Sequence, residues 1–398
     1  MQSKVDWESE FWALTEPEGL ALLAEAGEHP TPLPADLVRW RRTHSPERVS
    51  AAIRLAEGRR RGLAKFTRAG SMWMDPVGLE QSTSEVVARW KARRFAGQEV
   101  TDFCSGLGGD AIAFAEVASR VVALDADPGM TRRLKWNAEV YGVQERLIPI
   151  LGRVEHSPIG ETTLVHVDPD RRPVGSTRVR SVENYSPGLE QLLELSRTVE
   201  GGAFKVSPIS DFDEHFSGAG FEVELISLKG ECKEATVWFG SLAGCRKRAS
   251  CLPAGATWTD RDTPAGLRPR SAEAPLAWFY DPDPTLDRSS LLDGFAGFHG
   301  LSRIGTRRDA LTSADRVDSP FLAAFEVIEV LPFDRKLVRA WLAEREIGEV
   351  EIKPRGVAIV PATLRQELKP HGPGKISMFL IEAPRGRRAV MARRVGAP

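Results

Sequence analysis

The residues most able to do chemistry lie in V-T-D-F-C-S-G-L-G-G-D, which occupies Val100–Asp110. Its apolar start indicates a buried strand. The glycines that follow remove Cβ atoms where the backbone must turn sharply and where amides can approach a ligand. Ala111–Val117 is apolar, so the turn lies at the start of a helix. A strand, a glycine turn and a helix in this order are typical of a nucleotide-cofactor site.

A second acid supports a cofactor site. The stretch V-V-A-L-D of Val121–Asp125 indicates another strand, and Asp125 at its end can accept both hydroxyls of a ribose. A nicotinamide dinucleotide is the rival, because the glycines also satisfy the looser pattern G-x-G-x-x-A. In dinucleotide sites the apolar strand usually reaches the first glycine, whereas Asp102 and Ser105 interrupt it here. The carboxylate of Asp102 suits a methionyl amine better than a pyrophosphate, which favours S-adenosylmethionine.

Three segments resemble the class I methyltransferases, and within them the trimethylguanosine synthases that methylate guanine N2 of RNA. They are Asp102–Asp110, Val122–Asp127 and the box N-A-E-V-Y-G at Asn137–Gly142. The resemblance implies cofactor contacts from Asp102, Phe103, Cys104, Gly106, Gly108, Gly109 and Asp125. The family also has an S-x-T-P-E segment before the cofactor strand, and Ser82–Glu85 is similar to it without the proline. This adds Gln81 and Thr83 as candidate cofactor contacts, with simple helix capping as the alternative.

The chemistry is expected at the end of the strand in L-V-H-V-D-P-D-R, residues 164–171. Amine methyltransferases place Asp or Asn followed by prolines here, because a side-chain oxygen and a carbonyl accept the target's N–H bonds. We expect Asp168 and the carbonyl of Pro169 to be catalytic in this sense. The usual second proline and aromatic are replaced by Asp170 and Arg171, and Arg171 is expected to stack on a base or hold a phosphate. A plain turn with an ion pair is the alternative.

Lys205 opens a second chemistry and is a candidate substrate-binding residue. Ribose 2′-O-methyltransferases use a lysine on this strand beside an aspartate on the previous strand, and Glu234 could complete the group. Their other lysine, before the cofactor strand, has no counterpart here. His166 is expected to be packed or solvated and not a ligand.

The C-terminal part carries a second resemblance. V-E-I-K-P-R-G-V at Val350–Val357, followed by Pro361–Leu368 and two strand-like runs, is similar to the THUMP-like domain found behind such methyltransferases. Lys353 and Arg355 are therefore expected to contact the phosphates of a structured RNA, such as tRNA or rRNA. The alternative is a basic surface that pairs with the acidic stretch near Asp281–Asp287.

The order of strand-like and helix-like segments along the sequence predicts the elements that position these residues. Strands and helices alternate from Val100 onward, which predicts an α/β fold with a doubly wound, Rossmann-like sheet. An N-terminal helical region precedes it and an α+β THUMP-like domain follows. Predicted domains span 1–95, 96–260 and 275–398, with a linker in the Pro- and Gly-rich segment Pro253–Pro275. In the helix after Ser84, Val86 and Val87 are expected to face inward and Lys91 outward.

Composition sets outer bounds. The 398 residues carry 54 Lys and Arg against 55 Asp and Glu, so any nucleic-acid partner must meet a local patch. The four cysteines lack zinc-ligand spacing, and we expect no metal. Reduced cysteines and the lack of a signal-like start favour the cytoplasm, and no apolar run approaches membrane-spanning length. A small-molecule methyltransferase and a non-catalytic RNA-binding protein remain open alternatives, and the oligomeric state is not indicated.

Overall fold

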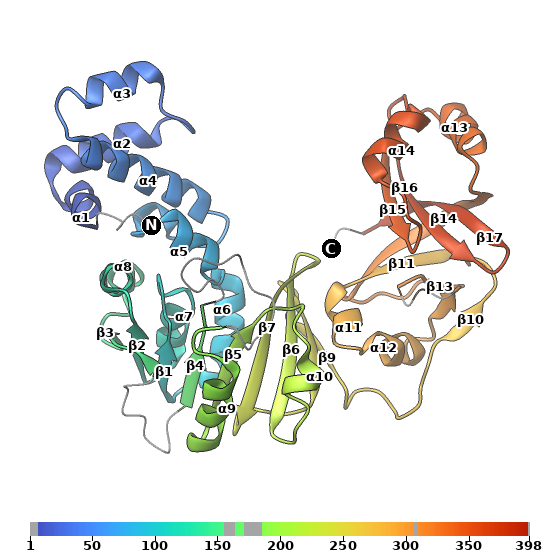
Figure 1. The fold of residues 1–398 in the computed structure, drawn as a ribbon. Coiled ribbons are helices and arrows are strands. Elements are labelled where there is room, and N and C mark those ends of the chain that lie inside the picture. Colours follow the sequence, from blue (N-terminus) through green and yellow to red (C-terminus); the bar gives the residue numbers. More distant parts are fainter. Residues whose placement is uncertain (1–6, 155–163, 171–184, 306, 308, 397–398) are drawn as a thin grey trace. The chain divides into compact units, whose positions relative to one another are not determined.

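The computed structural model describes residues 7–154, 164–170, 185–305, 307 and 309–396 (Figure 1). Internal contacts divide the chain into two units. The first consists of Met1–Ser210 with Trp238–Ala243, and the second of Asp211–Val237 with Gly244–Pro398. This is a division by contacts, and the three domains expected from the sequence remain a prediction.

The first unit begins with helices, as the sequence predicts. They are α1 (Trp7–Thr15), α2 (Pro17–Gly27), α3 (Pro34–Trp40), α4 (Pro46–Gly62), α5 (Pro76–Gln81) and α6 (Glu85–Ala92), with 3₁₀ turns η1 (Ala69–Ser71) and η2 (Arg93–Phe95). Proline lies in the first turn of α2 to α5, where its missing N–H leaves no helical hydrogen bond unmade. The helices bury an apolar cluster that includes Leu22, Trp40 and Leu55.

A buried acid ties these helices to the rest of the unit. The side chain of Glu10 is fully buried in α1 and accepts a hydrogen bond of 2.8 Å from Nε1 of Trp73. Its other partners are Arg133 of α8 at 2.7 Å and Arg54 of α4 at 3.4 Å. A buried carboxylate is tolerated only with such partners, so the N-terminal helices and α8 form one packed body.

The first sheet has the strand order β3-β2-β1-β4-β5-β7-β6-β8-β9. Its strands are β1 (Glu99–Phe103), β2 (Arg120–Asp125), β3 (Leu147–Leu151), β4 (Leu164–Val167), β5 (Gly201–Val206), β6 (Phe221–Leu228), β7 (Glu231–Gly240), β8 (Lys247–Leu252) and β9 (Ala256–Thr259). The first five pair in parallel. Helices α7 (Gly109–Val117), α8 (Pro128–Tyr141) and α9 (Leu189–Thr198) connect them, and α10 (Phe212–His215) precedes β6. This confirms the predicted α/β fold with a doubly wound sheet.

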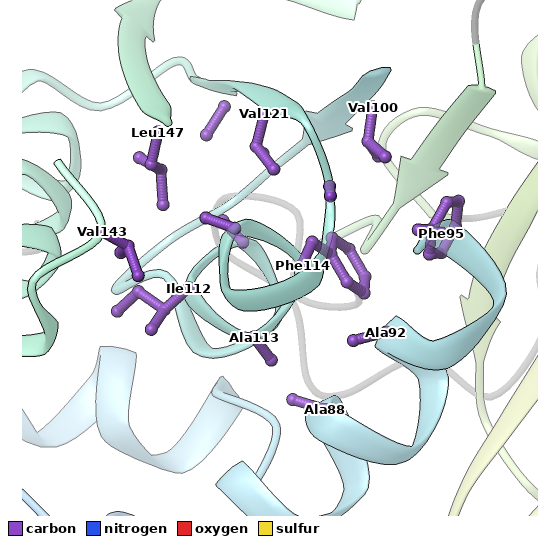
Figure 2. Close-up of a cluster of buried hydrophobic side chains, with 14 of the residues drawn as sticks. Ala88, Ala92, Phe95, Val100, Ile112, Ala113, Phe114, Val121, Val143 and Leu147 are labelled. Carbon is purple, nitrogen blue, oxygen red and sulfur yellow. The ribbon is translucent and has the colours of Figure 1, made fainter. Parts of the chain in front are cut away.

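The central strands are covered by α7 and α6 (Figure 2). Val100 lies directly beside Val121 on β2 and Leu164 on β4, so the three side chains share one face of the sheet. Phe114 of α7 packs on them and meets the ring of Phe95 at 4.8 Å between centroids. Two residues further along β1 and β4, Asp102 and His166 lie on the same face near the carboxyl ends of the strands. They interrupt an otherwise apolar surface.

The second unit contains a second sheet with the order β10-β12-β13-β11-β14-β17-β16-β15. Its strands are β10 (Arg270–Ala272), β11 (Trp278–Pro282), β12 (Ser302–Ile304), β13 (Leu311–Ser313), β14 (Leu322–Pro332), β15 (Ile347–Arg355), β16 (Gly374–Ala383) and β17 (Gly386–Val395). Its helices are α11 (Pro284–Arg288), α12 (Leu292–Phe298), α13 (Arg335–Glu344) and α14 (Pro361–Leu368). The two strand-like runs predicted after Pro361–Leu368 are confirmed by β16 and β17, and Pro361–Leu368 itself forms α14.

Clusters of buried apolar side chains stabilise this second sheet. Val338, Trp341 and Leu364 of α13 and α14 pack on Met391, while Phe279 and Phe379 belong to a separate cluster. The segment Pro253–Pro275 contains the short strands β9 and β10, and its place as the linker between domains stays a prediction. Short strands rich in Thr, Trp and Arg carry no clear alternation of apolar and polar residues, so the glycines and prolines around them dominate the pattern.

Candidate cofactor and active site

The glycine loop joins β1 to α7 and combines one packed position with one open position. Gly108 has a φ of 90°, and a Cβ there would lie 2.3 Å from Cδ1 of Leu134. Gly106 has a φ of 52°, but nothing lies within 4 Å of the place its Cβ would take. Cys104 also has a positive φ, of 60°, and burial raises the pKa of its thiol well above the usual value. The loop therefore leaves space beside the backbone at Gly106.

Asp125 at the end of β2 faces this loop. Its Oδ2 accepts a hydrogen bond of 2.8 Å from the amide of Gly106, and its Oδ1 accepts one of 2.8 Å from the amide of Asp127. Burial raises the pKa of Asp125, and the two amide hydrogen bonds oppose that rise. A carboxylate has about four lone-pair sites, so Asp125 retains capacity to accept ligand hydroxyls.

Asn137 of α8 links the glycine loop to the segment that contains Trp73. The amide Nδ2 donates to the carbonyls of Trp73 and Leu107, each at 3.1 Å, and Oδ1 accepts from the amide of Trp73 at 2.8 Å. The side chain is fully buried, and these hydrogen bonds satisfy its polar atoms. The box N-A-E-V-Y-G signals this residue in the sequence, but its role is visible only in the fold.

A line of buried polar side chains extends from Asp102. Because Asp102 and His166 are register partners on β1 and β4, Nδ1 of His166 lies 2.6 Å from Oδ1 of Asp102. Nε2 of His166 lies 3.5 Å from Nζ of Lys91, which forms an ion pair with Asp110 at 2.8 Å. Thr83 donates to Asp110 at 2.7 Å. We call these five residues the buried polar chain.

The charges in the buried polar chain shift the pKa values of its acids in opposite directions. Burial raises the pKa of Asp102, and the negative charges of Asp110 and Asp168 add to the rise, while His166 opposes it. Burial alone would raise the pKa of Asp110, but the charge of Lys91 lowers it below its ordinary value. Asp110 is thus a carboxylate held in its ionised form by a buried lysine.

The expected orientation of α6 is wrong for two residues. Lys91 is fully buried, and Val86 is 44% exposed. The alanines Ala88 and Ala92 make the buried face of α6, and their small size admits the lysine stem between α6 and α7. The burial of Lys91 could have been predicted from Asp110. This acid begins an otherwise apolar helix, and a buried acid needs a cation beside it.

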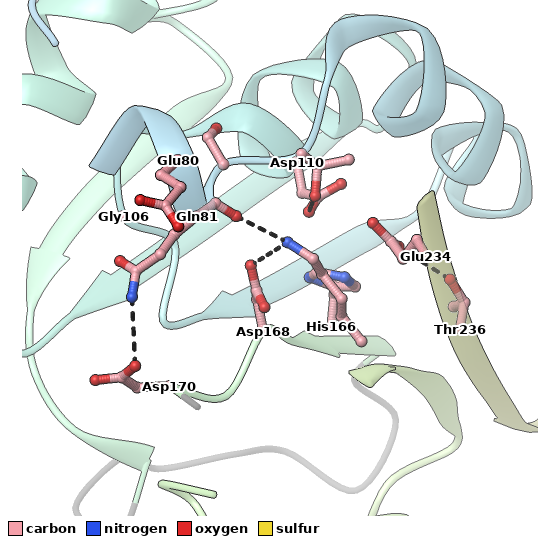
Figure 3. A network of polar contacts seen from close by, with 12 residues as sticks. Glu80, Gln81, Gly106, Asp110, His166, Asp168, Asp170, Glu234 and Thr236 are labelled. Atoms are coloured by element: carbon pink, nitrogen blue, oxygen red, sulfur yellow. Dashed lines mark hydrogen bonds and ion pairs between the residues drawn. The ribbon is translucent and has the colours of Figure 1, made fainter. Parts of the chain in front are cut away.

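A second polar group lies at the carboxyl end of β4 (Figure 3). Oδ2 of Asp168 lies 2.6 Å from Nζ of Lys205 on β5, and Nζ also donates to the carbonyl of Gln81 at 3.3 Å. The Gln81 side chain donates to Asp170 at 3.4 Å. The Asp168 amide donates to the carbonyl of Phe103 at 3.1 Å, which fixes the end of β4 beside the end of β1. The fold thus brings Asp168, Lys205 and Gln81 together.

Other sequence candidates have different surroundings. Pro169 is buried, and Asp170 pairs with Ser186 through two backbone hydrogen bonds. Arg171 lies outside the described residues. Glu234 is buried on β7, where its Oε1 accepts from Thr236 at 3.0 Å.

Lys353 and Arg355 on β15 both form ion pairs with Asp281 on β11, with the Lys353 Nζ at 2.8 Å. Three strands separate β15 from β11 in the sheet order, so the sheet curls far enough to bring them together. Their side chains are 21% and 18% exposed. The alternative expected from the sequence, pairing with the acidic stretch that begins at Asp281, is thus observed for these two cations.

Within the described ranges, no group of three or more His, Cys, Asp or Glu side chains is placed to hold a metal ion. The same ranges contain no helix of the length and hydropathy needed to cross a membrane.

The comparisons with known proteins bear on this geometry. Two curated proteins from Mycobacterium tuberculosis strains CDC 1551 and H37Rv, each described as an uncharacterized S-adenosylmethionine-dependent methyltransferase, are 35% identical over 323 residues. The match covers 79% of this chain and 86% of each relative. The chain belongs to the S-adenosylmethionine-dependent methyltransferases. Its cofactor is S-adenosylmethionine, as the sequence predicts.

Further matches divide this methyltransferase into parts. The family profile described as RNA cap guanine-N2 methyltransferase matches residues 97–239, and the THUMP domain-like profile matches 322–394. A domain of unknown function matches 8–62. The crystal structure of a candidate methyltransferase from Porphyromonas gingivalis has a TM-score of 0.76 at 20% identity and covers 96% of this chain and 99% of its own. That likeness shows a shared fold.

The described residues fit S-adenosylmethionine. The open space at Gly106 admits a ligand to the backbone, and the Asp125 carboxylate beside it can accept ribose hydroxyls. Among the described residues, Oδ2 of Asp102 is buried and has no hydrogen-bond partner. A buried carboxylate oxygen without a donor is costly, and the cationic amine of the cofactor is the type of group that would relieve it.

Proposed function

We propose that this methyltransferase transfers a methyl group to an exocyclic amine of a base in structured RNA. The Asp168 carboxylate carries the proposal, because it lies at the carboxyl end of β4 with 23% of its side chain exposed. The matches to an RNA cap guanine-N2 methyltransferase profile and to a THUMP domain-like profile support RNA as the substrate class.

Asp168 and the carbonyl of Pro169 would accept the two N–H bonds of the target amine. This orientation directs the nitrogen lone pair at the methyl carbon, where a C–N bond forms as the C–S bond of the sulfonium breaks. The proton that the nitrogen loses passes to the Asp168 carboxylate and then to solvent. Lys205 holds the carboxylate in place through its contact of 2.6 Å. Arg171 is proposed to contact the base or a phosphate.

The cofactor contacts are assigned to the residues around the glycine loop. Asp125 would accept the ribose hydroxyls, and Asp102 would face the methionyl amine. The remaining proposed contacts come from the loop and the segment before it: Phe103, Cys104, Gly106, Gly108, Gly109, Gln81 and Thr83. The hydroxyl of Thr83 already donates to Asp110, so its backbone is the part that would meet the cofactor.

RNA contacts are proposed for the second unit. Lys353 and Arg355 are mostly covered by their pairing with Asp281, and they would reach a phosphate only along their exposed edge. Arg387 and Arg393 of β17 have side chains 58% and 68% exposed, and we add them as phosphate contacts. Long-range attraction between such cations and phosphates needs no sequence readout, which suits an RNA recognised by shape.

The decisive experiment incubates the purified protein with S-adenosylmethionine labelled in the methyl group and total RNA, then digests the RNA to nucleosides. Label in a base-methylated nucleoside is the expected result, and the Asp168→Ala protein is the matched control. Label that stays out of RNA but enters a small-molecule extract would replace RNA with a small substrate. Binding of RNA without transfer to either would indicate a non-catalytic RNA-binding protein.

Ribose 2′-O-methylation is the second candidate, because Lys205 lies beside Asp168. A lysine beside an aspartate at a strand end can lower the effective pKa of a hydroxyl. The same labelled RNA distinguishes the two reactions, because a 2′-O-methyl group blocks alkaline cleavage of the adjacent phosphodiester. Label in alkali-resistant dinucleotides would support the ribose reaction, whereas label in mononucleotides supports the base reaction. Location in the cytoplasm stays a prediction from the sequence.

A further inference from the structure

The buried polar chain has a fixed direction of hydrogen bonding. An ammonium group has three donors and no acceptor, so Nε2 of His166 must accept from Nζ of Lys91. The ion pair of 2.8 Å with Asp110 keeps Lys91 charged. Because the His166 ring accepts this bond at Nε2, that nitrogen carries no hydrogen. The one N–H of the ring is then on Nδ1 and donates to Oδ1 of Asp102.

This direction leaves one oxygen of Asp102 without a donor. Oδ1 is engaged by His166, while Oδ2 is buried without a hydrogen-bond partner among the described residues. Asp102 and His166 are both 0% exposed, so bulk water does not satisfy Oδ2. The nearby acids Asp110 and Asp168 each form an ion pair with a lysine, Lys91 and Lys205 respectively. Oδ2 of Asp102 is thus the carboxylate oxygen that a cationic ligand group would satisfy.

We propose that His166 is a positioning residue that presents Oδ2 of Asp102 to the amine of the methionyl part of S-adenosylmethionine. Lys91 and Asp110 act behind it, by holding the ring as the Nδ1–H tautomer. The edge-on contact of the ring with Phe114, at 5.0 Å between centroids, holds its plane. The proposal rests on the cofactor contact assigned to Asp102 above. It is a role for the amino-acid end of the cofactor only, and the nucleoside end is left to Asp125.

The test compares two ligands that differ in the group concerned. S-adenosylhomocysteine carries the amino-acid portion, whereas 5′-methylthioadenosine has the nucleoside and thioether without it. Calorimetry on the full chain measures both dissociation constants for wild type, Asp102→Asn, His166→Leu and His166→Asn. We expect His166→Leu to weaken S-adenosylhomocysteine roughly tenfold and to leave 5′-methylthioadenosine within about twofold. His166→Asn retains a donor near the place of Nδ1 and should recover most of that loss.

The possible results distinguish the role of His166 from the cofactor contact assigned to Asp102. If Asp102→Asn binds S-adenosylhomocysteine as wild type does, the Asp102 contact is wrong and the role of His166 is overturned with it. If Asp102→Asn weakens that ligand but His166→Leu does not change the ratio of the two affinities, only the role of His166 is overturned. A general loss of fold would weaken both ligands alike, which the ratio detects.

A second measurement uses the wild-type chain alone. Nitrogen-15 chemical shifts of the His166 ring in the wild-type chain report which ring nitrogen carries the proton. We expect the neutral Nδ1–H tautomer, and a change at Nδ1 when S-adenosylhomocysteine is added but not when 5′-methylthioadenosine is added. The Nε2–H tautomer, a doubly protonated ring or an equal response to both ligands would overturn the proposal.

Discussion

Nζ of Lys205 lies 2.6 Å from Oδ2 of Asp168, and the two side chains come from adjacent parallel strands at their carboxyl ends. The lysine is 6% exposed and the aspartate 23%, so the pair presents its carboxylate to solvent and its ammonium to the protein. The carboxylate proposed to accept N–H bonds from the substrate is thus the exposed member of the pair, and its counter-ion is the buried one. This order favours the base reaction over the ribose reaction.

Asp168 and Lys205 should contribute to methyl transfer to different extents. Asp168→Ala should lower methyl transfer at least about 100-fold, because it removes an acceptor aimed at the reacting amine. Asp168→Asn retains a side-chain oxygen and should keep more activity than the alanine variant. Lys205→Met should reduce transfer less than Asp168→Ala in the base reaction and abolish it in the ribose reaction. Single-turnover rates with labelled cofactor measure all three, and full activity of Asp168→Ala would contradict the assignment.

Asp125 should contribute equally to the binding of S-adenosylhomocysteine and of 5′-methylthioadenosine. Asp125→Ala removes the acceptor for the ribose hydroxyls, which both S-adenosylhomocysteine and 5′-methylthioadenosine contain. Both affinities should fall roughly 10- to 100-fold, as expected for the removal of charged hydrogen bonds. Calorimetry checks this, and Glu139→Gln on the exposed side of α8 is a control that should change neither. An Asp125→Ala protein with unchanged affinities would remove the ribose assignment.

The affinity for the cofactor should fall in acid, because Asp102 and Asp125 both become protonated there. Burial raises the pKa of both Asp102 and Asp125 above the ordinary value of 3.8. If the ligand contacts their ionised forms as proposed, affinity is full above these raised pKa values and falls as the pH drops through them. 5′-Methylthioadenosine should report Asp125 alone, and S-adenosylhomocysteine should show a steeper acid loss because it reports both. Calorimetry across the acid range tests this, and identical profiles for the two ligands would count against it.

Local patterns predict the cofactor half of the site better than the chemistry around it. The glycine loop and Asp125 are adjacent in the chain to strands whose apolar runs are evident, so their meeting follows from the fold class. The partnership of His166 with Asp102 depends on the register of β1 against β4, which are 64 residues apart in this contact. A lysine on an amphipathic helix usually faces solvent, and only the acid at Asp110 reverses that expectation for Lys91.

Lys91 and Asp110 should make a large contribution to stability. Lys91→Met leaves the buried carboxylate of Asp110 without its counter-ion, and the free energy of unfolding should fall by about 3–5 kcal/mol. Because the folded pKa of Asp110 is lowered, its stabilisation is present above the unfolded pKa and is lost as the pH falls. The double variant with Asp110→Asn should recover much of the loss at neutral pH. Denaturant unfolding measures the three proteins, and equal stability of wild type and Lys91→Met would contradict the ion pair.

The exposed and the covered cations of the second unit should behave differently. Replacing Arg387 and Arg393 with Gln should weaken RNA binding and reduce the slope of log affinity against log salt by about 0.7–0.9 for each phosphate that is no longer neutralised. Stability should change little, because both side chains are more than half exposed and their acidic partners Glu382 and Glu326 are solvated. Replacing Lys353 and Arg355 instead leaves Asp281 without its partners, so unfolding should become easier by about 1–3 kcal/mol.

Matched variants separate charge from fold in this last comparison. Glu382→Gln and Glu326→Gln release Arg387 and Arg393 from their acidic neighbours, so RNA affinity should rise at low salt and the rise should vanish at high salt. Filter binding across a salt series, with unfolding curves for each protein, gives both quantities. An RNA affinity that ignores salt and all four substitutions would mean that β17 is not a phosphate-contacting strand, and that the basic residues of this unit serve its folding alone.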